Sequence, residues 1–88
     1  MIDINLINHI MRAVGEQGSD NNHTSWTDNV SLSYGMYIVN DEPMIYIKCV
    51  ELHEPKETLV DLNIPESCFD DCRQRVRVLL SEALIAVD

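Results

Sequence analysis

Three cysteines and one histidine are the side chains of this chain best suited to bind a transition metal. Cys49 and His53 lie four positions apart, as do Cys68 and Cys72. Thiolate and imidazole groups are ordinary zinc ligands, but structural zinc sites usually use Cys-x-x-Cys pairs, which this chain lacks. Cys72 also falls in an apolar helical stripe, where a free cysteine behaves as a small hydrophobe. We therefore predict no metal and no cofactor, and leave open whether the four side chains meet at a metal.

The sequence carries no pattern typical of an enzyme. Its three glycines form no phosphate-binding loop, and Asp20-Asn21-Asn22 lacks the glycine and final glutamate of a calcium loop. The three histidines have no evident nucleophile or carboxylate arranged with them. We therefore predict a protein that is not an enzyme.

Acidic residues outnumber basic ones by fifteen to six in 88 positions, which gives a formal net charge of −9. The largest basic group is Arg73, Arg75 and Arg77, which a helix would spread over a wide arc. Such a chain repels the phosphates of nucleic acid and attracts basic protein surfaces. We expect no direct binding of nucleic acid, and a host protein with a basic surface as the partner.

Carboxylates scattered along a surface can imitate the field of a phosphate backbone. An inhibitor of this kind would occupy the basic groove of a nucleic-acid enzyme, whereas the alternative is a solvated acidic surface that maintains solubility. Trp26, in a polar segment, either anchors the partner or covers the open end of the core, and the second reading is somewhat favoured. The predicted partner-binding residues are Trp26, Asp41, Glu42, Glu51, Glu54 and Glu57.

The elements that would position these residues follow from periodicity. Apolar residues at helical spacing predict a helix over 3–14, begun by Asp3, and a second helix after Asn63 or Ser67. Alternating residues predict strands over 30–39, 44–52 and 58–62, the last at an edge, and residues 15–29 form a long polar loop. We predict one α+β domain over 1–88, a two-layer α-β-β-β-α fold with a three-stranded antiparallel sheet and helices on one face.

The second helix is apolar nearly all round over residues 78–87, so one sheet would leave part of it uncovered. A second chain is a natural cover, which predicts a homodimer as the alternative function, a structural or adaptor protein. The predicted dimer interface consists of Val76, Leu80, Leu84 and Val87.

The N-terminal residues match neither a signal peptide nor a membrane span. An odd number of cysteines fits a reducing compartment. We therefore expect a cytoplasmic protein that does not enter the membrane.

In layout the chain resembles the small acidic anti-CRISPR and other phage counter-defence proteins. The similarity lies in its length, an opening helix (1–14), a β-hairpin (30–52) and a closing helix (69–87). The resemblance rests on no specific motif. It implies a phage or mobile-element origin, action in the host cytoplasm, and obstruction of an RNA-guided nuclease by charge mimicry.

Overall fold

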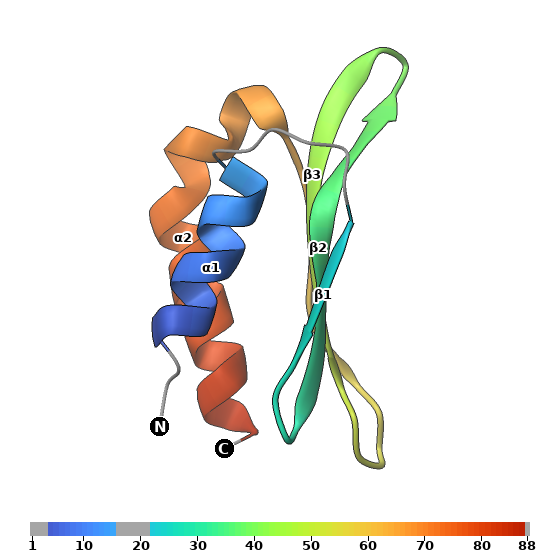
Figure 1. The fold of residues 1–88 in the computed structure, drawn as a ribbon, viewed down its shortest axis with the longest axis vertical. Helices are drawn as coiled ribbons and strands as arrows, with labels where there is room; N and C mark the ends of the chain where they lie inside the picture. Colours follow the sequence, from blue (N-terminus) through green and yellow to red (C-terminus); the bar gives the residue numbers. More distant parts are fainter. Residues whose placement is uncertain (1–3, 16–21, 88) are drawn as a thin grey trace.

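A computed structural model describes residues 4–15 and 22–87 and has two layers, a β-sheet and a pair of helices (Figure 1). The elements are α1 (Ile4–Gly15), β1 (His23–Trp26), β2 (Val30–Val39), β3 (Glu42–Glu51), β4 (Thr58–Pro65) and α2 (Glu66–Ala86). The strands are antiparallel and lie in the order β1-β2-β3-β4. The predicted α+β class is confirmed, but the sheet has four strands where the sequence predicted three.

Helix α1 buries the stripe that its periodicity predicts. Ile7, Ile10, Met11 and Val14 are all buried against the sheet and α2. Spacings of three and four place these side chains on one side of a helix. The predicted cap, Asp3, lies outside the described residues.

Strands β2 and β3 form the predicted hairpin, and they pair without interruption from Val30↔Glu51 to Val39↔Glu42. The two turn residues, Asn40 and Asp41, have φ values of 52° and 64°. Positive φ at both central residues is typical of the two-residue turn that matches the twist of paired strands, and Asn and Asp tolerate it better than most residues.

Strand β1 lies inside the segment that the sequence predicted to be a loop. It pairs with β2 from His23↔Tyr34 to Trp26↔Ser31. The connection to β2 is a tight turn in which the Thr27 amide donates to the Val30 carbonyl at 3.0 Å, and the Val30 amide donates to Thr27 Oγ1 at 3.1 Å. The prediction of a loop over 15–29 is therefore wrong at Gly15, which ends α1, and over His23–Trp26, while residues 16–21 lie outside the described ones.

Strand β4 lies at an edge of the sheet, as predicted, and runs on to Pro65 rather than ending at residue 62. Helix α2 then begins at Glu66 with Pro65 as its N-cap. Neither predicted cap, Asn63 nor Ser67, occupies that position. A β-bulge between Cys49 and Val50 shifts the register where β4 begins.

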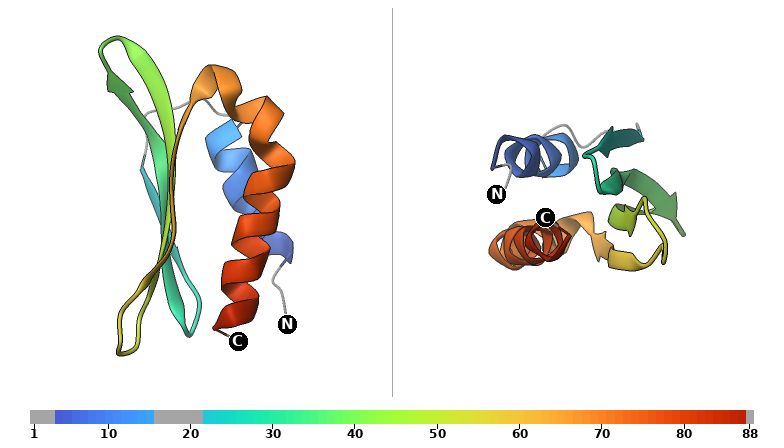
Figure 2. Two further views of the ribbon diagram at one scale, coloured as in Figure 1. Left: turned by 180° about the vertical axis from the view of Figure 1, so that it is seen from behind. Right: turned by 90° about the horizontal axis from the view of Figure 1, so that it is seen from below.

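Both helices cover the same face of the sheet, as the two views in Figure 2 show. The core lies between the layers, where residues of all elements except β1 form one buried cluster. Arg77 of α2 donates to Asn8 Oδ1 of α1 at 2.9 Å, which ties the two helices together. None of the described helices is long and apolar enough to cross a bilayer.

The residues predicted to form a dimer interface lie inside this fold. Val76, Leu80 and Leu84 are buried in the core and Val87 packs against it. Helix α1 and the sheet together provide the cover that the sequence assigned to a second chain. The assignment of these residues to a dimer interface is therefore corrected, and the large apolar residues that α2 exposes are Val78 and Ile85.

Candidate protein-binding surfaces

The sheet turns one face to the helices and leaves the other, here called the open face, uncovered (Figure 1). Successive strand residues point to opposite faces. Tyr34 and Ile47 are buried toward the helices, so the residues next to them in the sequence point to the open face. The open face is only lightly charged. By register it carries Thr24, Trp26, Ser31, Ser33, Gly35, Tyr37, Val39, Glu42, Met44, Tyr46, Lys48, Val50, Asp61, Asn63 and Pro65.

Two tyrosines of the open face are fixed by hydrogen bonds to asparagine side chains. Tyr37 donates to Asn63 Oδ1 at 2.7 Å, and Tyr46 donates to Asn22 Oδ1 at 2.8 Å. Their rings lie 6.0 Å apart, and burial raises the pKa of Tyr46. These side chains form a rigid aromatic surface at the middle of the sheet.

Trp26 is exposed, with 66% of its surface accessible, and does not cover the core. Its neighbour Ser25 faces the helices and shares a hydrogen bond of 2.6 Å with the Tyr34 hydroxyl, so alternation directs Trp26 to the open face. The favoured reading of Trp26 as a core residue is wrong, and its large apolar surface is free for contact with a partner.

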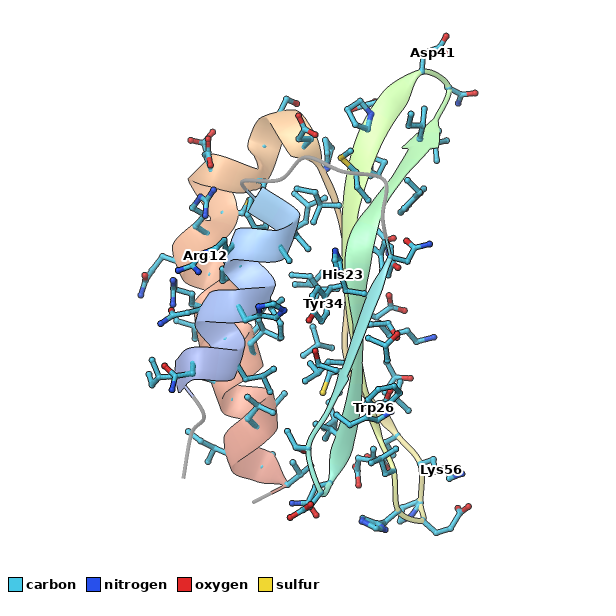
Figure 3. The ribbon with its side chains drawn as sticks, viewed as in Figure 1. Arg12, His23, Trp26, Tyr34, Asp41 and Lys56 are labelled. Carbon is cyan, nitrogen blue, oxygen red and sulfur yellow. The ribbon has the colours of Figure 1, made fainter. Side chains whose placement is uncertain are left out.

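The predicted contact acids fall into two groups at opposite ends of the sheet. Asp41 and Glu42 lie at the β2–β3 turn, while Glu51, Glu54 and Glu57 lie at or beside the β3–β4 turn. The ten residues of β3 separate the groups by about 30 Å. Figure 3 shows Asp41 at one end, Lys56 at the other, and Trp26 nearer to Lys56. The acids therefore form two separate sites.

Glu51 and Glu57 line a cleft between the β3–β4 turn and the end of α2. This cleft, here called the acidic cleft, has a volume of about 450 Å³. Asn29 and His53 complete its polar side, and its apolar wall consists of Leu59, Ala86 and Val87. The cleft thus combines negative charge with an apolar wall.

Backbone hydrogen bonds hold this end of the sheet together. The Leu52 amide donates to the Asn29 carbonyl and the Glu51 amide donates to the Glu57 carbonyl, both at 2.9 Å. The His53 ring also contacts the Asp28 carbonyl oxygen at 2.9 Å. Two turns distant in the sequence are therefore joined, and Trp26 lies at the same end as the acidic cleft.

A second, apolar cleft of about 210 Å³ lies between β4 and α2. Its lining consists of Leu62, Ile64, Cys72, Arg75, Val76 and Leu79. The cleft has the size of one or two apolar side chains.

The possible metal ligands remain apart in the described part of the chain, where no group of three or more histidine, cysteine or acidic side chains is placed to hold a metal. Cys49 is buried in β3, and burial, followed by the charge of Glu51, raises its pKa to about 11. Cys68 is exposed on α2, Cys72 lines the apolar cleft, and His53 lies at the β3–β4 turn.

The three arginines of α2 do not form a common basic surface. Arg73 Nε pairs with Asp70 at 2.8 Å, and its guanidinium lies 5.0 Å from the centre of the Phe69 ring. Arg77 binds Asn8 and Arg75 lines the apolar cleft. Each of the three arginines thus contacts a different part of the molecule.

Sequence reasoning missed the open face, because its members are known only once the register of four strands is known. It also missed the contacts of Tyr34, whose ring stacks on His23 at 5.5 Å and meets His9 edge-on at 6.2 Å. No family model, curated protein or solved structure matches this chain.

Proposed function

We propose that this protein is a small acidic binding module that docks on the basic surface of a partner protein. The observation that carries the proposal is the acidic cleft, which lies at the same end of the sheet as the exposed Trp26. An indole ring on the open face and a charged cleft beside α2 together provide an anchor and a charge contact at one end of the molecule.

The acidic cleft suits a lysine or arginine side chain. The carboxylates of Glu51 and Glu57 attract the cationic group, while Leu59, Ala86 and Val87 offer an apolar wall to the aliphatic stem. Exposed ion pairs contribute about 0–1 kcal/mol each, so affinity requires several of them and weakens with salt.

The proposed partner is a host protein that handles nucleic acid, such as an RNA-guided nuclease. Acidic residues lie at both ends of the sheet, about 30 Å apart, and Asp61 on β4 lies between them. The negative charge therefore extends along the length of the molecule. Charge spread over that length competes for a basic groove made for a phosphate backbone. This proposal includes a phage or mobile-element origin and a cytoplasmic site of action.

The alternative of a homodimeric adaptor joined through α2 has less support. Three of its four predicted interface residues are core residues of this fold. A dimer through α2 would have to use the exposed Val78 and Ile85 instead.

The proposal is tested by capture of partners from a bacterial lysate on the tagged protein, washed at low and high salt. Two charge-reversed variants are compared, Asp41→Lys/Glu42→Lys at the turn and Glu51→Lys/Glu57→Lys in the acidic cleft. The matched control, Asp71→Lys/Glu82→Lys, changes the net charge equally on exposed positions of α2. Circular dichroism verifies that each variant folds.

We expect a nucleic-acid-handling protein to be retained at low salt and released at high salt. Both test variants should lose it, because each removes one acidic site, whereas the control should retain it. If all three variants lost the captured protein equally, net charge alone would explain the binding, and the two acidic sites would have no specific role. Recovery of the protein alone, insensitive to salt, would favour the homodimer.

A further inference from the structure

The outer edge of β2 is open beyond the end of β1. Strand β1 pairs with Ser31–Tyr34 only, whereas β2 continues to Val39. In an antiparallel hairpin with a two-residue turn, Val39 and Glu42 direct their backbone groups at each other. Because the direction alternates along a strand, the backbone groups of Met36 and Ile38 point away from β3, toward the outer edge of β2. Among residues 4–15 and 22–87, no strand pairs with Met36 or Ile38 at that edge.

The other open edges carry features that discourage pairing. Strand β4 has Asp61, Pro65 and a break in register at Leu59, and the end of β3 beyond β4 contains Pro43. Strand β1 is four residues long. Charges, prolines, bulges and short length are the usual protection of a sheet edge against added strands.

The segment Gly35–Val39 has none of these protections. Its sequence, Gly-Met-Tyr-Ile-Val, is uncharged and rich in residues that favour strands. Ile38 is 62% exposed and Val39 46% exposed, because the hairpin extends past the helices (Figure 1). Backbone groups that no described strand pairs with and exposed apolar side chains therefore coincide at one edge.

We propose that this edge receives an extended segment of a partner protein, added as a fifth strand beside β2. The segment has apolar side chains, which contact Ile38 and Val39, and basic residues at its end, which face Asp41 and Glu42. Backbone hydrogen bonds to Met36 and Ile38 fix the segment, as in other cases of strand addition. The inference rests on the proposed function in one respect, since it assumes the same basic partner.

The test uses a synthetic peptide, Lys-Lys-Val-Thr-Val-Thr-Val-Lys, and nuclear magnetic resonance of the ¹⁵N-labelled protein. Addition of the peptide should shift the amide signals of Met36 and Ile38 and slow their exchange with solvent. A peptide with glutamate in place of each lysine should bind at least about tenfold more weakly.

Two variants at one position separate the backbone contact from the side-chain contact. Ile38→Pro removes the outward amide, and an edge strand tolerates proline where the amide faces solvent. Ile38→Thr keeps the amide and removes most of the apolar surface. We expect Ile38→Pro to weaken peptide binding by about tenfold or more and Ile38→Thr by less.

Equal binding by the wild type and Ile38→Pro would overturn strand addition. If the peptide then still loses affinity in Asp41→Lys/Glu42→Lys, the proposed charge-based function stands without strand addition. Shifts of the same amides with protein concentration alone would assign the edge to a second copy, and would overturn the partner segment. An absence of shifts at millimolar peptide would also count against it.

Discussion

At the scale of single residues, the thiol of Cys49 couples stability to pH. Its pKa is raised from the ordinary 9.0 to about 11, first by burial and then by Glu51. The unfolded chain therefore releases this proton at lower pH than the folded chain. The stabilisation is complete below pH 9 and is lost as the pH rises through about 11.

We expect the free energy of unfolding of the wild type to fall more steeply between pH 9 and 11 than that of Cys49→Ala. Urea unfolding at several pH values measures both slopes. Cys68→Ala, which changes an exposed thiol, is the matched control and should follow the wild type. Parallel slopes for the wild type and Cys49→Ala would show that the buried thiol has no such effect.

At the scale of elements, α2 is held by side chains that the sequence assigned to a dimer. Leu80 is fully buried in the core, whereas Val78 of the same helix is 43% exposed. Leu80→Ala should lower the free energy of unfolding by about 2–5 kcal/mol, since it leaves a cavity. Val78→Ala should change it by about 0.5 kcal/mol or less. Urea unfolding at two protein concentrations tests this, because a dimer interface at Leu80 would make the loss depend on concentration.

The contrast between α2 and β1 shows what the sequence could and could not predict. The stripe containing Phe69, Val76 and Leu80 predicts the helix and its buried side, because burial follows the helical repeat. Strand β1 is His-Thr-Ser-Trp, short and polar, and it depends on pairing with β2, which no local pattern reveals. Trp26 was misjudged for the same reason, since the face it occupies is decided by that pairing. The sequence predicted the hairpin. That its acidic residues form two groups about 30 Å apart became clear only from the full length of β3.

At the scale of the whole molecule, nine net negative charges act on a body with extents of 37 × 22 × 17 Å. Mutual repulsion of these charges opposes the folded state, and salt screens it over a Debye length of about 10 Å at 0.1 M. We expect the melting temperature to rise between 10 and about 150 mM sodium chloride, as measured by circular dichroism. Asp71→Lys/Glu82→Lys should reduce the rise, because it makes the net charge less negative. A melting temperature that is constant or falls with salt would contradict this expectation.

The contact between the first and last helices has a consequence for the order of folding. Arg77 and Asn8 are 69 positions apart, whereas β2 and β3 are joined by a two-residue turn. Hairpins close in about 1–10 μs, and closing a longer segment costs more entropy. We therefore expect the hairpin to form before α1 docks on α2. During synthesis, the part of Ile7, Ile10 and Met11 that packs against α2 stays in contact with water until α2 has left the ribosome, so α1 is the segment that a chaperone would have to protect.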